Sequence, residues 1–218
     1  VTAEATQEAI RTIRRLKSKN PESLVVVTGC SAQVDTEKFK DLPGADLVVA
    51  NSHKGQLEDL IRQHLRGELN NERIFKSNIF KKEDLEEGGG VEEEHTRAFL
   101  KIQDGCNSFC TFCVIPFARG KSRSLTLDAI RERVNTLLAD GAREIVLTGV
   151  HIGDYEFGLE NLIEHLLLNT RVPRLRLTSL EPIELTDRLI ELFEDPRLCR
   201  HFHMSIQSAT TSVLAGMK

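Results

Sequence analysis

Short continuous apolar runs alternate with amphipathic stretches in the first 67 residues of the chain. Residues 24–28 and 46–50 are rich in Val and Leu without polar alternation, which is typical of strands covered on both faces. Apolar residues that recur with a helical period predict helices over 3–18 and 56–65. Because strands and helices alternate, we expect a parallel sheet in a three-layer α/β domain over residues 1–67.

The same alternation is more regular over residues 98–218. The expected elements are strands at 98–102, 144–148, 174–179 and 202–207, helices at 126–139, 159–168 and 186–194, and a last helix that includes Leu214. Four strand–helix units amount to half of an eight-unit parallel barrel. The fold class that we predict is therefore α/β, with the three-layer domain followed by a partial (β/α) barrel.

Residues 68–97 separate these two regions and are polar. Three glycines at 88–90 lie between acidic groups that include Glu86-Glu87 and Glu92-Glu93-Glu94. Such a composition buries little apolar surface, and ordering it costs backbone entropy. We expect a mobile, acidic, Gly-rich linker over 68–97 that marks the domain boundary.

Three of the five cysteines, Cys106, Cys110 and Cys113, follow the expected strand 98–102 within eight residues. Thiolates are the usual ligands of iron–sulfur clusters, and a four-iron cube held by three of them keeps one iron open. Two alternatives remain, an apolar stripe on one helical face and a zinc site. Pro116 argues against a helix through Cys113, and no His-x-x-x-His or second Cys-x-x-Cys pair is evident for zinc.

Cys-x-x-x-Cys-x-aromatic-Cys after a first strand resembles the motif of the radical S-adenosylmethionine (radical SAM) enzymes. The longer string from Lys101 to Gly120 is similar to the methylthiotransferases that act on tRNA or on a ribosomal protein. Lys-Ile-Gln before the cysteines and Ala-Arg-Gly after them are most similar to the bacterial MtaB-type enzymes. Those enzymes modify N6-threonylcarbamoyladenosine beside the anticodon.

The resemblance implies a 4Fe-4S cluster on the three loop cysteines and SAM at its open iron. It also implies cofactor contacts at strand ends, where parallel barrels place their chemistry. The expected SAM-binding residues are Phe112, Gly149, Ser179, Glu181 and Gln207. A cap or turn role is the alternative for the strand-end residues among them. Beyond the cluster ligands we expect no catalytic side chain, and we expect His151 to take no part and Cys199 to be structural.

Cys30 resembles the third of three cysteines that hold a second 4Fe-4S cluster in the family's N-terminal domain. The other two have no counterpart in this sequence, and the first expected helix lacks the strand that usually precedes such a crossover helix. We therefore expect a chain that is cut off at its beginning, and an unfinished barrel indicates the same for its end. In the complete enzyme the second cluster would deliver the methylthio group.

Composition indicates the cellular compartment but does not indicate the substrate. The net charge of −4 gives no sign of nucleic-acid binding, so tRNA as substrate follows from the resemblance alone, as does an electron donor such as flavodoxin or ferredoxin. An odd number of clustered cysteines fits reduced thiols, and no run of about 20 apolar residues is present, so we expect a cytoplasmic protein without membrane contact. Isopentenyladenosine in tRNA, a ribosomal-protein aspartate, or a non-catalytic iron–sulfur or zinc binding module are the alternative functions.

Overall fold

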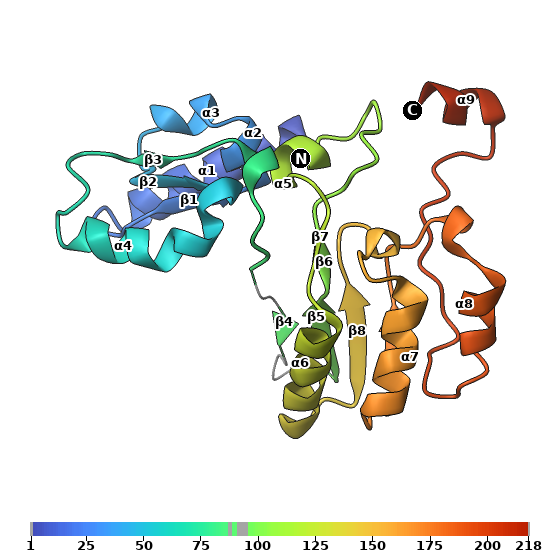
Figure 1. Ribbon diagram of the computed structural model, residues 1–218. Helices are drawn as coiled ribbons and strands as arrows, with labels where there is room; N and C mark the ends of the chain where they lie inside the picture. The colour runs from blue at the N-terminus through green and yellow to red at the C-terminus, as the bar shows by residue number, and fades with distance from the viewer. Residues whose placement is uncertain (1, 87–88, 91–95, 218) are drawn as a thin grey trace. The chain divides into compact units, whose positions relative to one another are not determined.

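The computed structural model describes residues 2–86, 89–90 and 96–217 and divides into two compact units (Figure 1). The first unit contains Val1–Glu86 together with Phe112–Lys121. The second contains Glu87–Thr111 together with Ser122–Lys218. Each unit has its own parallel sheet strands and its own core.

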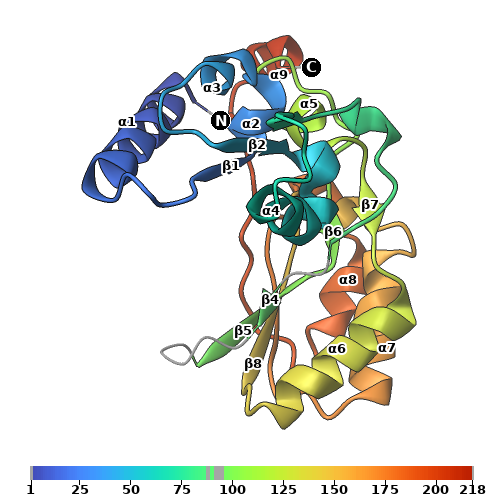
Figure 2. The ribbon, with the colours of Figure 1, turned by 90° about the vertical axis from the view of Figure 1, so that its left-hand side faces the viewer.

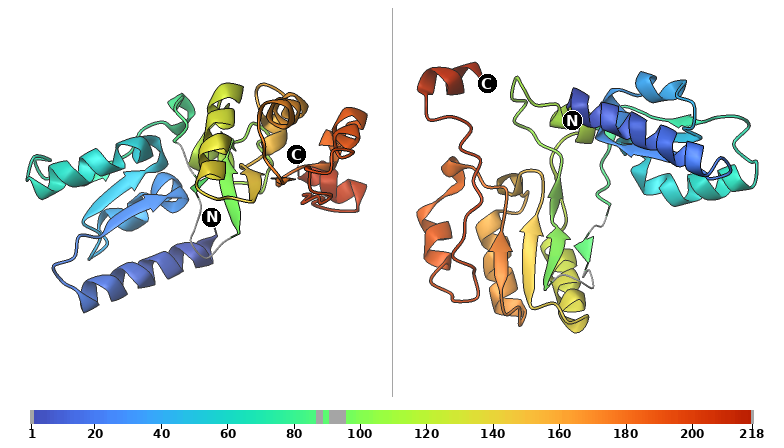
Figure 3. Two further views of the ribbon diagram at one scale, coloured as in Figure 1. Left: turned by 90° about the horizontal axis from the view of Figure 1, so that it is seen from below. Right: turned by 180° about the vertical axis from the view of Figure 1, so that it is seen from behind.

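The first unit is built on a parallel sheet of three strands in the order β1 (Val26–Gly29), β2 (Leu47–Ala50) and β3 (Ile74–Phe75). The long helices α1 (Ala3–Lys19) and α4 (Leu57–Leu65) lie on opposite sides of this sheet in Figure 3. The shorter elements of the unit are α2 (Cys30–Val34), α3 (Glu37–Lys40), η1 (Asn51–Gln56), η2 (Ile79–Lys81) and α5 (Ile115–Arg119). The helices and strands predicted before residue 67 are confirmed to within two residues, and the 3-10 turn η1 leads directly into the second predicted helix.

Helix α1 shows why this part of the sequence folds as it does. The Thr2 hydroxyl caps the helix by accepting a hydrogen bond from the Ala5 amide at 3.1 Å. On the inward face Ile13 is only 7% exposed and packs with Val27 and Phe39. Each fully buried aliphatic or aromatic side chain of this kind stabilises the fold by about 1.5–3 kcal/mol.

Strand β3 corrects the expectation of a linker over 68–97. Ile74 and Phe75 pair with Val48 and Val49 of β2, so this segment completes the first sheet. The following residues are also packed, because the Lys82 side chain is 3% exposed and forms ion pairs with Asp84 and Glu86. A two-residue strand has no periodicity of its own, and the surrounding polar residues therefore hid it. Residues 87, 88 and 91–95 of the expected linker lie outside the described residues.

The second unit contains a four-stranded sheet in the order β4 (Gly89–Gly90), β5 (Arg97–Lys101), β8 (Glu144–Thr148) and β9 (Leu175–Leu177). The last three strands are parallel, and β4 is antiparallel to β5. Helices α6 (Leu127–Ala139), α7 (Leu159–Asn169) and α8 (Asp187–Leu192) cover one face of the sheet (Figures 1 and 2). The remaining elements are a small antiparallel pair, β6 (Gln103–Asp104) with β7 (Arg123–Ser124), and η3 (Ile152–Asp154), η4 (Pro182–Glu184) and α9 (Thr211–Gly216).

The core of the second unit lies between this sheet and its helices. Ile145 and Leu147 point from β8 into the core and meet Ile130 of α6 and Leu162 of α7, and all four are fully buried or nearly so. The strand predicted at 144–148 is confirmed with the same bounds because its run is apolar on both faces. The core holds the carboxyl ends of β5, β8 and β9 at one edge of the sheet.

The prediction of a strand at 202–207 is wrong. A single β-bridge joins Met204 to Leu180. Ser179, which lies in sequence between β9 and Leu180, has a left-handed backbone with φ of 57°. This conformation ends the ladder of β9 and prevents a longer pairing with the next segment. Phe202 and Ile206 are accordingly 41% and 64% exposed instead of buried. The strand expected at 174–179 is likewise shorter, Leu175–Leu177.

Candidate active site

The three-cysteine loop begins where β6 ends. Gly105, with φ of 81°, turns the chain out of the strand immediately before Cys106. Cys106, Cys110 and Cys113 are half-buried and lie outside any helix or strand. They therefore do not form the apolar helical stripe that was the alternative.

Helix α5 begins only after the last of these cysteines, at Ile115, with Pro116 in its first turn. A proline is tolerated there because the first-turn amides have no helical partner, and no helix runs through Cys113, as Pro116 indicated. Between Thr111 and Phe112 the chain passes from the second unit to the first. Cys106 and Cys110 thus belong to the second unit and Cys113 to the first.

The Cys106 thiol lies beside an ionisable cluster. Its pKa is lowered chiefly by a hydrogen bond with His151, against the opposing effect of burial, and the Ser108 amide also donates to its sulfur at 3.4 Å. The same hydrogen bond with Cys106 raises the pKa of His151 to about 9, and the charges of Glu184 and Asp154 act in the same direction. Ligand atoms of Cys106, His151 and Asp154 all lie within 4.8 Å of one another. The surroundings favour the thiolate, which is the form of cysteine that binds metal.

His151 had no role in the sequence analysis, yet it is at the centre of this cluster. Its Nε2 lies 2.5 Å from Glu184 Oε1 without hydrogen-bond geometry, and its Nδ1 lies 3.4 Å from Asp154 Oδ2. Glu184 also accepts a hydrogen bond from the Glu181 amide at 2.7 Å. The signal in the sequence was the position of His151 three residues after an apolar strand, where polar residues of parallel sheets gather.

The expected SAM-binding residues fall in different places. Gly149 follows β8, and Ser179 and Glu181 follow β9, so these three lie at the same edge of the sheet. Gln207 lies in the irregular segment before α9 with φ of 61°. Phe112 is 57% exposed and belongs to the first unit.

Gly149 is in contact with a residue that the sequence analysis had not assigned to the site. A Cβ atom at Gly149 would lie 2.8 Å from Gln103 Oε1 and 3.0 Å from the Gln103 carbonyl oxygen, so a larger residue does not fit without movement. The amides that follow, of Val150 and His151, both donate to Gln103 Oε1 at 3.0 Å. The loop after β8 is therefore held against β6, the strand that leads into the cysteine loop.

Cys30 occupies the corresponding strand end in the first unit. Gly29, with φ of 97°, ends β1, and α2 begins at Cys30. The side-chain amide of Asn51, which is 9% exposed, donates to Cys30 Sγ at 3.6 Å and to the Ala118 carbonyl at 2.8 Å. Asn51 was also missed by sequence reasoning, although it directly follows β2 at the same edge of the sheet. Cys199, in contrast, is buried, and burial raises the pKa of its thiol.

Comparison with known proteins identifies the family. Residues 100–218 match the model of the radical SAM superfamily, and residues 1–50 match that of uncharacterized protein family UPF0004. The chain belongs to the radical SAM superfamily. Two relatives named threonylcarbamoyladenosine tRNA methylthiotransferase MtaB, from Aquifex aeolicus and Bacillus subtilis, are 36% and 34% identical over the whole chain. A tRNA-2-methylthio-N(6)-dimethylallyladenosine synthase from Thermodesulfovibrio yellowstonii is 28% identical over 94% of the chain.

The chain spans about half the length of these three relatives, 54%, 50% and 47% in the same order. Among solved structures, the radical SAM methyltransferase TsrM from Kitasatospora setae, with bound cobalamin and a [4Fe-4S] cluster, is 20% identical. That match covers 55% of this chain and 24% of the TsrM chain, with a TM-score of 0.47. The two MtaB relatives, which align along the whole chain, confirm the resemblance to the MtaB-type enzymes noted from the cysteine motif.

Radical SAM proteins use a 4Fe-4S cluster and SAM, and the donor set of this chain fits the cluster. Three cysteines share one short loop, and the surroundings of Cys106 favour its thiolate. Soft thiolates are the ligands that iron–sulfur clusters require. Along the described part of the chain, no helix is both long and apolar enough to cross a membrane.

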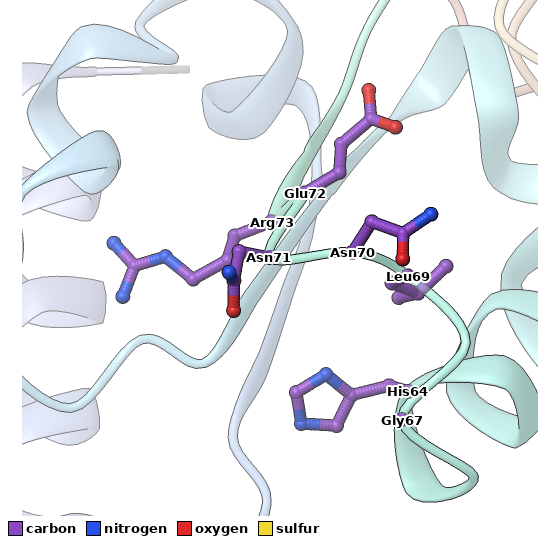
Figure 4. Close-up of a pocket in the computed structure, with 7 residues that line it drawn as sticks. All are labelled: His64, Gly67, Leu69, Asn70, Asn71, Glu72 and Arg73. Atoms are coloured by element: carbon purple, nitrogen blue, oxygen red, sulfur yellow. The ribbon is translucent and has the colours of Figure 1, made fainter.

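A separate hollow of about 440 Å³ lies in the first unit at the loop between α4 and β3 (Figure 4). Asn70 and Asn71 form its wall with left-handed backbones, φ 45° and 66°. In Figure 4 the side chains of His64 and Asn71 are turned toward the same space, while Glu72 points away. The hollow precedes β3, whereas Cys30 follows β1, so the two lie at opposite edges of the parallel sheet. It is therefore not part of the Cys30 site.

Proposed function

We propose that this chain carries the cluster-binding and SAM-binding part of a methylthiotransferase that modifies N6-threonylcarbamoyladenosine beside the anticodon of tRNA. The observation that carries the proposal is the three-cysteine loop inside a string similar to MtaB-type enzymes. Two relatives with the MtaB name align along all of the chain at 36% and 34% identity, which supports it. The partial barrel and the three-layer first domain are the fold that we propose for this function.

Cys106, Cys110 and Cys113 would hold the 4Fe-4S cluster through one thiolate each. When bound, the cluster supplies one-electron cleavage of SAM, and the protein supplies binding and orientation. His151 donates a hydrogen bond toward Cys106 and so favours the thiolate before the metal binds. In this proposal no side chain other than the cluster ligands is catalytic.

Three of the proposed SAM contacts lie at strand ends of the second unit, Phe112 lies on the cysteine loop, and Gln207 lies in the irregular segment before α9. Gly149 would present backbone groups to the amino acid part of SAM, and Ser179 and Glu181 would line the same edge of the sheet. Phe112 and Gln207 complete the proposed set. A strand-end position supports Gly149, Ser179 and Glu181, and all five assignments otherwise follow from the family resemblance.

Cys30 would be one ligand of a second 4Fe-4S cluster in the complete enzyme. Its thiol is half-buried at the end of β1, and Asn51 already donates a hydrogen bond to its sulfur. Hydrogen bonds of this kind tune iron–sulfur centres. We further propose a cytoplasmic enzyme that receives electrons from a donor such as flavodoxin or ferredoxin.

Anaerobic reconstitution with iron and sulfide tests the core of the proposal. We expect a brown protein whose reduced cluster changes its electron paramagnetic resonance (EPR) spectrum when SAM is added. A colourless protein that binds zinc instead would refute the enzyme and support the non-catalytic binding module.

The target base is a separate question, because relatives named for dimethylallyladenosine are 28–31% identical over 94–95% of the chain. Nucleoside analysis of tRNA from a deletion strain, complemented with the full-length gene, separates the two bases. Restoration of methylthiolated threonylcarbamoyladenosine supports the proposal. Restoration of the isopentenyladenosine derivative assigns the protein to that alternative target, and restoration of neither nucleoside is the outcome expected for a ribosomal-protein target.

A further inference from the structure

Gln103 is a polar residue at a position where an apolar side chain would be expected. It is 0% exposed and forms β6 together with Asp104, between the sheet strand β5 and the cysteine loop. Burying an amide is costly unless its hydrogen-bonding groups are paired. The position therefore needs an account of what the amide does.

All of the polar atoms of the Gln103 side chain are used. Its Oε1 accepts hydrogen bonds from the amides of Val150 and His151, each at 3.0 Å. Its Nε2 donates to the Gly105 carbonyl at 2.7 Å and to Ser122 Oγ at 2.8 Å. One carboxamide thus joins the first residue of the cysteine loop to the loop that follows β8.

The packing at Gly149 restricts this arrangement further. A Cβ there would lie 2.8 Å from Gln103 Oε1 and 3.0 Å from Ile152 Cγ2, so the loop after β8 approaches Gln103 as closely as a bare backbone allows. Neither loop can move relative to the other without breaking hydrogen bonds to the same side chain. Both ends of the contact lie within the second unit.

We propose that Gln103 is a positioning residue that sets the distance between the cysteine loop and the Gly149–His151 loop. The consequence for activity rests on the proposed function, in which one loop holds the cluster and the other binds SAM. Gln103 contacts neither group in this proposal. It acts by fixing the backbone on which each of them is held, so that SAM meets the open iron in one geometry.

Two substitutions at Gln103 distinguish its contact with the Val150 and His151 amides from its contact with the Gly105 carbonyl. Gln103→Met has a similar size but removes both the acceptor and the donor. Gln103→Glu keeps an acceptor for the Val150 and His151 amides but places an oxygen against the Gly105 carbonyl. Thr170→Val is the matched control, because the Thr170 hydroxyl is a buried donor to Leu166 O at 2.7 Å, just ahead of β9 and at the other edge of the sheet.

Hydrogen exchange of the metal-free 218-residue chain is the first measurement. In Gln103→Met we expect amide exchange at Val150 and His151 to become about tenfold faster or more, since each buried amide loses its partner. Gln103→Glu should keep their protection and lose it only around Gly105 and Cys106. Thr170→Val should leave both loops as in the parent. Unchanged exchange at Val150 and His151 in Gln103→Met would overturn the proposal without any reference to the cluster.

The second measurement uses the anaerobically reconstituted chain and SAM. We expect Gln103→Met to keep the parent's iron and sulfide content, because the three thiolates remain, but to bind SAM about tenfold more weakly and to lose the SAM-dependent change in the EPR spectrum. Parent-like SAM affinity and spectra in Gln103→Met would overturn the positioning role. A parent that takes up no iron would refute the proposed function instead, and the exchange data would still decide the contact.

Discussion

Gly153 offers a test of how tightly the loop after β8 is packed. A Cβ atom at this position would lie 1.5 Å from Glu184 Oε1 and 1.9 Å from its Cδ, far inside ordinary contact, which begins at 3.4 Å. In Gly153→Ala the Glu184 carboxylate must therefore move by about 2 Å, since the end of a flexible side chain yields more easily than the backbone. Such a displacement breaks its 2.7 Å hydrogen bond with the Glu181 amide.

The expected loss of stability follows from the role of that hydrogen bond as a helix cap. Glu184 and Glu181 form a reciprocal capping box at η4, and losing a cap costs about 0.5–2 kcal/mol. We expect Gly153→Ala to lower the free energy of unfolding by about 1–2 kcal/mol, or about 2–8 °C in melting temperature for a chain of this size. Glu184→Ala should cost a similar amount, because it removes the same hydrogen bond.

The double substitution decides between this cause and a backbone effect at Gly153. Once Glu184 is truncated the added methyl group meets no carboxylate, so Gly153→Ala should cost nothing further in that background. Urea unfolding of the four proteins, followed by circular dichroism, gives the cycle, and Gly216→Ala is the control because nothing lies within 4 Å of a Cβ there. Additive losses to within about 0.5 kcal/mol would refute the steric argument.

Three further predictions concern the metal site, the pH dependence of stability and the activity of the chain. Replacing any one of the three loop cysteines with Ala should abolish cluster assembly, whereas Cys199→Ala should keep the parent's iron content; equal iron in Cys110→Ala and the parent would contradict the assignment. Burial raises the pKa of Glu144, but hydrogen bonds from Arg176 and Arg174 outweigh it and leave the pKa below its usual value. The stability that these ion pairs provide is therefore present above the unfolded-state pKa of about 4.3, and it is lost as the pH falls through the pKa of Glu144 in the folded protein. Glu144→Gln should lower the free energy of unfolding, measured with urea, by about 1.5–3 kcal/mol at pH 7 and by much less at pH 3. The 218-residue chain has Cys30 as its one candidate ligand for the second cluster, so we expect about one cluster per chain and no methylthiolated nucleoside from tRNA incubated with it.

Much of the fold could be predicted from the sequence because local pattern and tertiary environment agree there. Residues 144–148 are apolar on both faces and form β8 with the predicted bounds. Strand β3 could not be predicted, since two residues have no period and become a strand only through pairing with β2. The prediction for 202–207 failed for the opposite reason. This segment has a strand-like composition, but the left-handed backbone of Ser179 ends the β9 ladder with which it would pair.

Some residues of the candidate site could likewise be predicted from the sequence, and others could not. Three closely spaced cysteines carry their chemistry in the sequence itself, so the metal ligands could be proposed from spacing. His151 and Gln103 could not be assigned, because each acts through residues far along the chain. Gln103 is 47 residues from Val150, and nothing near it in sequence indicates that its carboxamide is shared between two loops.

The two glycines of the loop after β8 show why such contacts escape sequence reasoning. Glycine is usually explained by a positive φ, yet Gly149 and Gly153 do not have one. Each is small because a side chain from elsewhere occupies the space of its Cβ, Gln103 at the first and Glu184 at the second. Those two side chains hold the loop from opposite ends, and His151 lies between the two glycines with its ring beside Cys106. The identity of both glycines is therefore set by the packing that brings the strand-end loop to the cysteine loop, which is a property of the folded unit and not of the local sequence.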